Sequence, residues 1–87
     1  MNKYTLICKR SAKKEKSKLP IDIQQIVAKE LKFLKSNPSP DGCKKLRGSN
    51  GLYRIRVARK YRIVYFVDNV NLIVEILRIS HRSEAYE

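Results

Sequence analysis

The chain is poor in the residues that bind metals or form disulfides. Its 87 residues include one histidine, two cysteines and no tryptophan. Zinc sites draw on clusters of histidine and cysteine, so this composition predicts no metal site. Cys8 and Cys43 lie far apart, without Cys-x-x-Cys spacing. We interpret both as small buried hydrophobic residues, with a single disulfide as the open alternative.

Long apolar runs are also missing. The apolar segments are short and interrupted by charged residues, which excludes a transmembrane helix. The sequence shows no signal peptide, which favours a protein of the reducing cytoplasm. At 87 residues, we expect one domain spanning residues 1–87. A domain of this size buries a small core, so we expect marginal stability without a partner.

Acidic residues are scarce. Eight of them stand against 20 lysines and arginines, which gives a formal net charge of +12. Such an excess supports a polyanionic partner, either nucleic acid or an acidic protein. The alternative is a basic protein that is merely well solvated, but solvating surfaces usually mix charges of both signs.

The first half of the sequence predicts a strand and two helices. Residues 4–8 (YTLIC) are rich in strand formers, and residues 9–18 (KRSAKKEKSK) predict a short basic helix that Ser11 caps. We interpret this basic run as a docking surface. Pro20 suits the start of a second helix, predicted over residues 21–35. Its apolar stripe has helical spacing and comprises Ile23, Ile26, Val27, Leu31 and Leu34.

The second half predicts a sheet. A turn cluster at residues 37–42 (NPSPDG) ends the helical half, and the apolar period then becomes two. A hairpin turn is expected at residues 68–71 and a tighter one at Arg59-Lys60. The predicted strands cover residues 43–46, 52–58, 61–67 and 72–79. Together these elements predict an α+β fold, with both helices on one face of a small, mainly antiparallel sheet and the other face open to solvent.

Arginines alternate with apolar residues in the predicted sheet. In the segment LYRIRV, Arg54 and Arg56 should point to one face while Tyr53, Ile55 and Val57 point to the other. Guanidinium groups on one open face are suited to binding phosphates, since the planar fork meets two oxygens at once. The alternative for Arg54 and Arg56 is a pair of exposed charges that keep the sheet soluble.

The order of these motifs resembles the RelE/ParE superfamily of toxins from type II toxin–antitoxin modules, and within it the RelE side. The resemblance runs from about residue 4 to residue 86. It is carried by residues 18–27 (KLPIDIQQIV), 34–48 (LKSNPSPDGCKKLRG), 52–57 (LYRIRV), 61–67 (YRIVYFV) and 76–86 (ILRISHRSEAY). RelE-type members cut messenger RNA in the ribosomal A site without metal or cofactor. ParE-type members share the fold but poison DNA gyrase, so fold alone does not decide the function.

The resemblance implies a set of site residues. Arg54 and Arg56 correspond to the basic residues that contact the phosphate backbone, and Arg62 to the phosphate-stabilising arginine. Arg82 matches the leaving-group arginine. Tyr86 corresponds to a C-terminal tyrosine that acts as general base or stacks on a base; its alternative role is to anchor the chain terminus.

Two further residues leave alternatives open. His81 is the one side chain with an ordinary pKa near neutrality, so it is an alternative general base or acid, or else a neutral histidine at a strand end. Arg78 either adds a fourth phosphate contact or pairs with Glu75.

Three functions follow as hypotheses. The first is a ribosome-dependent, metal-independent endoribonuclease toxin; the second is a gyrase inhibitor of the same fold; the third is an inactive nucleic-acid-binding relative. The basic, aromatic tail favours the first, because a gyrase inhibitor does not need it. The expected partners are an antitoxin with an acidic, amphipathic wrapping segment, together with the ribosome and messenger RNA.

Overall fold

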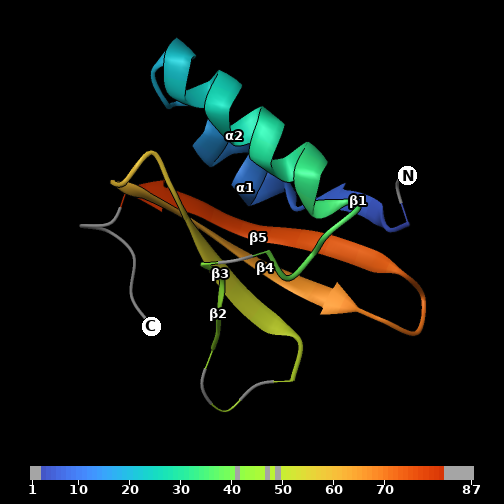
Figure 1. The fold of residues 1–87 in the computed structure, drawn as a ribbon. Helices are drawn as coiled ribbons and strands as arrows, with labels where there is room; N and C mark the ends of the chain where they lie inside the picture. The colour runs from blue at the N-terminus through green and yellow to red at the C-terminus, as the bar shows by residue number, and fades with distance from the viewer. Residues whose placement is uncertain (1–2, 41, 47, 49, 82–87) are drawn as a thin grey trace.

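Two helices lie across one face of a five-stranded sheet, which confirms the predicted α+β class (Figure 1). The computed structural model describes residues 3–40, 42–46, 48 and 50–81. The elements are β1 (Thr5–Cys8), α1 (Arg10–Ser17), α2 (Ile21–Leu34), β2 (Lys44–Lys45), β3 (Leu52–Val57), β4 (Tyr61–Asp68) and β5 (Ile73–His81).

The strands follow the order β1-β5-β4-β3-β2 across the sheet. Strands β2 to β5 form an antiparallel meander, and β1 joins β5 in parallel. Parallel neighbours need a long connection. Here the two helices and the first three strands of the meander lie between β1 and β5 in the chain, and α1 packs against β5.

The core lies between the helices and the sheet. Alternate residues of β3 and β4 point into it, among them Ile55, Val57, Ile63 and Tyr65. The Tyr65 hydroxyl donates a hydrogen bond to the Pro38 carbonyl at 2.7 Å. Burial raises the pKa of this phenol, which therefore stays protonated as a donor and holds the loop that leads into β2.

The start of α1 differs from the prediction. Lys9, not Ser11, is the N-cap residue, and no side chain caps the helix. The reason lies in β1, because the Lys9 amide still bonds to the Ile76 carbonyl of β5 at 2.9 Å. The chain therefore passes directly from strand into helix, and Ser11 already lies inside the first turn.

The second helix keeps most of its predicted stripe. Val27, Leu31 and Leu34 are buried and Ile23 packs against them, whereas Ile26 is 43% exposed. The stripe is thus narrower than the sequence pattern indicated. The helix also ends one residue early, with Lys35 as its C-cap.

Most strand boundaries shift by one or two residues. The strand predicted over residues 43–46 shrinks to Lys44–Lys45, and β5 begins at Ile73 and runs on to His81. The longer β5 brings Ser80 and His81 into the sheet, opposite Arg62 and Tyr61 of β4. Cys8 and Cys43 are free thiols, half-buried against the core.

The turn between β4 and β5 depends on Asp68. Its carboxylate accepts hydrogen bonds from the Val70 and Asn71 amides at 2.9 and 3.0 Å, and from the Asn71 side chain at 2.9 Å. These bonds lower the pKa of the Asp68 carboxyl, with Asn71 as the largest cause.

We expect Asp68→Ala to lower the stability of the protein at neutral pH. Because the folded-state pKa is depressed, the contribution of Asp68 is fully present above the unfolded-state pKa and is lost as the pH falls through the folded value. Urea unfolding at neutral pH and at a pH below the carboxyl range measures this. A variant equally weakened at both pH values would show that the hydrogen bonds to the ionised carboxylate are not the cause.

The turn between β3 and β4 is built without glycine. Ala58 and Arg59 have φ values of 50° and 65°, and the Lys60 amide bonds back to the Ala58 carbonyl at 2.7 Å. Side chains other than glycine rarely occupy this left-handed region, and each such residue costs about 1–2 kcal/mol.

Ala58→Gly should therefore stabilise the protein by about 1 kcal/mol. The matched control is Ala28→Gly on the exposed side of α2, where the same change should destabilise by about 1 kcal/mol because glycine is a poor helix former. Urea midpoints of the two variants measure both effects. The account of the turn would be wrong if both substitutions lowered the midpoint equally.

Candidate nucleic-acid interface

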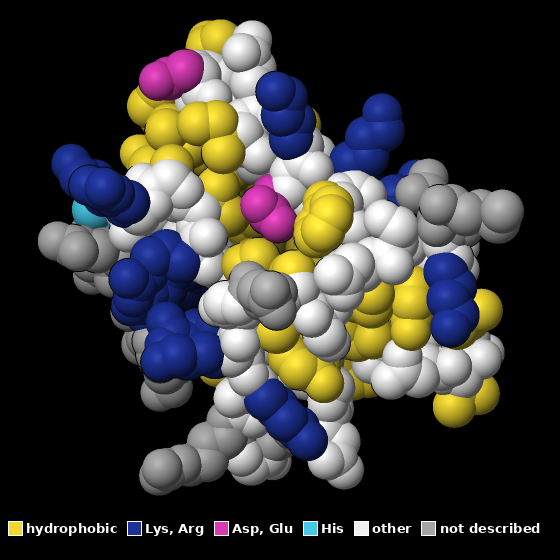
Figure 2. Space-filling view, in the orientation of Figure 1, with side chains coloured by type: hydrophobic (Ala, Val, Ile, Leu, Met, Phe, Trp, Pro, Cys, Tyr) yellow, Lys and Arg dark blue, Asp and Glu magenta, His cyan; other side chains and the backbone are white. Residues whose placement is uncertain are grey.

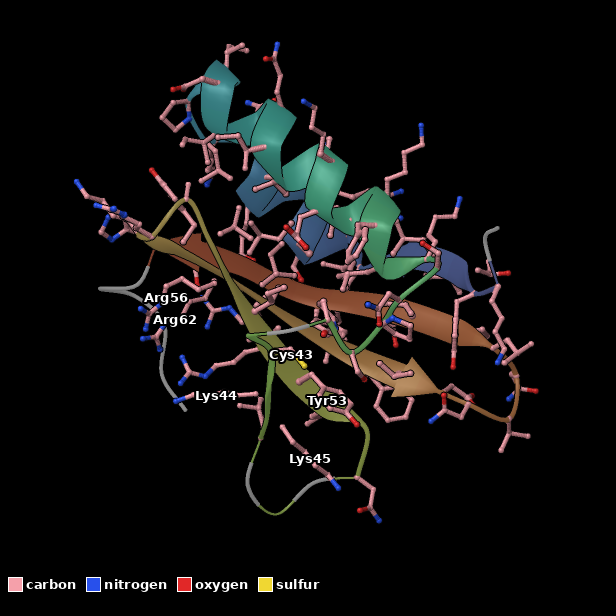
Figure 3. The ribbon with its side chains drawn as sticks, viewed as in Figure 1. Cys43, Lys44, Lys45, Tyr53, Arg56 and Arg62 are labelled. Carbon is pink, nitrogen blue, oxygen red and sulfur yellow. The ribbon has the colours of Figure 1, made fainter. Side chains whose placement is uncertain are left out.

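Arginines from adjacent strands meet on the face of the sheet that points away from the helices. Arg56 of β3 lies directly opposite Arg62 of β4, and Arg54 lies opposite Lys44 of β2. Figure 3 shows the Lys44, Arg56 and Arg62 side chains extending to the same side of the ribbon. We call these four residues, Lys44, Arg54, Arg56 and Arg62, the cationic face.

The cationic face carries a cost to the free sheet. Like charges directly opposite each other across two strands are destabilising, and here two such pairs occur in consecutive rows. A sheet face that served only for solubility would alternate the signs of its charges. The arrangement therefore places four cations where one anionic ligand can contact several of them.

The shape of the cationic face also suits a ligand. A depression of about 300 Å³ is lined by Gly42, Lys44, Arg54 and Arg56. Arg56 is exposed and Arg54 half-buried, while the Nε atom of Arg62 is buried. A buried Nε restricts the arginine side chain, so the guanidinium of Arg62 is held in place before a ligand arrives. Figure 2 shows further lysine and arginine side chains gathered beside the end of the β3–β4 hairpin.

His81 and Arg78 lie apart from the cationic face. The His81 ring packs edge-on against Tyr61 at 5.2 Å between centroids. It also lines a cavity of about 330 Å³ with Glu15 of α1 and Lys18, the residue that caps the end of that helix. A register shift opposite Val64 and Tyr65 interrupts β5 beside Arg78. The Arg78 guanidinium contacts Glu15 at 3.3 Å, a contact that neither predicted alternative, a phosphate or Glu75, included.

The cysteines and the acidic residues are dispersed over the described part of the chain. Within it, no three histidine, cysteine or acidic side chains gather where they could hold a metal ion. Burial raises the pKa of the Cys8 thiol, against the opposing effect of Lys13 and Lys16, which fits a packing role.

No helix among the described residues is long and apolar enough to cross a membrane.

Most of the chain matches a known family. Residues 6–86 match the model of the ParE toxin of type II toxin–antitoxin systems, parDE. The chain belongs to the RelE/ParE superfamily of toxins. A comparison with curated protein sequences gives no match.

Solved structures of toxin–antitoxin complexes resemble the toxin closely. The archaeal RelE–RelB complex from Pyrococcus horikoshii OT3 gives a TM-score of 0.83 at 25% identity, covering 95% of this chain and 99% of the other. The RelBE2 complex from Mycobacterium tuberculosis gives 0.79 at 31% identity, covering 91% and 98%. The intact RelBE complex from E. coli gives 0.80 at 27%, covering 97% and 99%.

The structure brings some of the predicted site residues together and places others elsewhere. Arg54, Arg56 and Arg62 come together, whereas Arg78 and His81 face α1. Arg82 and Tyr86 lie outside the described residues. Lys44 was missed because a two-residue strand leaves almost no periodic pattern; its pairing with Arg54 appears only in three dimensions.

Proposed function

We propose that this type II toxin is a ribosome-dependent endoribonuclease that cleaves messenger RNA in the A site. The observation that carries the proposal is the Arg56–Arg62 pair, two guanidinium groups opposed on an open sheet face. A scissile phosphate placed between them would relieve their repulsion and gain charge-assisted hydrogen bonds from both.

The proposed reaction needs no cofactor. The 2′-hydroxyl of the message attacks the adjacent phosphorus, the bond to the 5′-oxygen breaks, and a base and an acid move one proton each. The products are a 2′,3′-cyclic phosphate and a 5′-hydroxyl. Arg56 and Arg62 stabilise the charge of the pentacovalent phosphorus, and each well-placed donor contributes about 3–4 kcal/mol. Arg54 contacts the phosphate backbone beside them.

Proton transfer is assigned through the family resemblance. Tyr86 is the proposed general base and Arg82 the residue at the leaving oxygen. Nearby guanidinium groups favour the ionised form of a phenol, which makes a tyrosine a better base beside an arginine cluster. His81 is the alternative base or acid; its contact with Tyr61 on the α1 side favours the tyrosine.

A gyrase-inhibiting function is the second candidate, favoured by the match to the ParE toxin model. Such a toxin acts through a protein-binding surface. The paired arginines of the cationic face support the nuclease instead, since a protein contact does not require opposed guanidinium groups.

The proposed silencing partner is an antitoxin, as in the RelE–RelB and RelBE structures. The net charge of +12 favours an acidic wrapping segment, which would stabilise the toxin by binding and neutralise it at once. The working site would be the ribosome in the cytoplasm, whose RNA surface also attracts the basic residues of α1.

The test is primer extension on a defined message with and without ribosomes. We expect cuts phased with codons that appear only with ribosomes, and loss of a cut when the nucleotide that supplies its 2′-hydroxyl is 2′-deoxy. Products with a 5′-phosphate would contradict the mechanism, and an intact message would contradict the function.

A further inference from the structure

We propose that Lys44 and Arg54 form a second phosphate-binding subsite, which holds the phosphate next to the scissile one in a single RNA strand. The inference rests on the proposed nuclease function and extends it. Nothing in the family resemblance assigns a role to Lys44; the assignment comes from its position in the sheet.

The sheet arranges its cations in two rows. Arg56 and Arg62 form one row across β3 and β4, and Lys44 and Arg54 form the next across β2 and β3. Arg54 and Arg56 are two residues apart on one strand, so the rows are separated by roughly 7 Å and face the same way. Successive phosphates of an extended strand can therefore occupy successive rows.

The second row opens into the depression of about 300 Å³ that Gly42 also lines. Gly42 adds no side chain to its wall, and apart from its chain neighbours no described residue places an atom within 4 Å of where its Cβ would be. Lys44 is exposed and supplies a compact ammonium charge, while Arg54 supplies the planar fork. A phosphate in the depression would meet both without moving the strands.

The neighbouring lysine provides the contrast. Lys45 follows Lys44 on β2 and lies opposite Tyr53, so alternation directs it to the other face of the sheet. Both lysines lie on β2, are exposed and carry one positive charge. They differ only in the face of the sheet that they occupy.

The test compares Lys44→Ala with Lys45→Ala in the full-length toxin. We expect Lys44→Ala to raise the Kd for a short single-stranded RNA about tenfold and to reduce the slope of log affinity against log salt by about one. In the ribosome assay it should raise the half-saturating toxin concentration similarly, with the maximal rate nearly unchanged. Lys45→Ala should stay within about twofold of the wild type in Kd.

Equal effects of the two variants on RNA affinity would overturn the subsite, as would a wild-type Kd for Lys44→Ala. Urea unfolding of both variants checks that the domain remains folded. The RNA-binding comparison can fail or succeed independently of the cleavage assay, because it measures affinity directly. A wild type that never cuts a message contradicts the nuclease, while the RNA-binding comparison still decides the role of Lys44.

Discussion

Arg62→Ala is expected to reduce the rate of ribosome-dependent cleavage by about 100- to 1,000-fold. Removing one fixed cation from developing phosphate charge costs about 3–4 kcal/mol of transition-state stabilisation. The buried Nε atom makes Arg62 the most restricted member of the cationic face. In the alanine variant, neither water nor a neighbouring flexible side chain should supply an equally well-placed positive charge. Primer extension over time in a purified translation system measures the rate.

Loss of charge alone must be separated from loss of the site. Lys32→Ala removes one positive charge from the exposed surface of α2 and should leave the rate within about twofold. Urea unfolding of the Arg62→Ala protein checks that the fold is retained. Cleavage at the wild-type rate by Arg62→Ala would remove this residue from the site.

Glu15→Ala is expected to destabilise the toxin by about 2–3 kcal/mol. The Glu15 carboxylate accepts a hydrogen bond from the Ile79 amide at 2.9 Å and contacts the Arg78 guanidinium at 3.3 Å. Ile79 is buried in β5. The substitution leaves a buried amide without its charged acceptor, and that cost exceeds the value of an exposed ion pair. Urea unfolding measures it.

Two further variants locate the source of this stability. Glu75→Ala removes the acidic residue of β5 and should change the free energy of unfolding by less than about 0.5 kcal/mol. Arg78→Ala should cost less than about 1 kcal/mol, because the Arg78 side chain is 37% exposed. If Arg78→Ala proved as damaging as Glu15→Ala, the ion pair and not the amide bond would hold α1 to β5.

The sequence predicted the fold class, and it predicted which face of the sheet Arg54 and Arg56 occupy. Both follow from the regular spacing of apolar residues in helices and strands. Because successive side chains of a strand alternate between its two faces, Arg54 and Arg56 share a face however β3 pairs with its neighbours. The opposition of Arg56 and Arg62 depends on the length of the turn between β3 and β4. The sequence predicted a turn at Arg59-Lys60, but the residues at positive φ are Ala58 and Arg59. Neither is the glycine or asparagine that usually marks such positions.

The features that the sequence did not predict depend on tertiary contacts. The Lys9 amide stays in the sheet and removes the predicted Ser11 cap, and a register shift in β5 accompanies the turn of Arg78 toward Glu15. His81 joins β5 because the strand continues two residues past the predicted end. Local patterns do not contain these partners, which are 63 or more residues away from α1 and β1.

The most direct test of the account titrates one preparation of the toxin into two assays in parallel. One measures translation and integrity of a defined message in a purified system, and the other measures DNA supercoiling by gyrase. If the toxin is the proposed nuclease, translation stops with cuts in the message, at toxin concentrations that leave supercoiling unchanged. Inhibited gyrase beside an intact, fully translated message would contradict it.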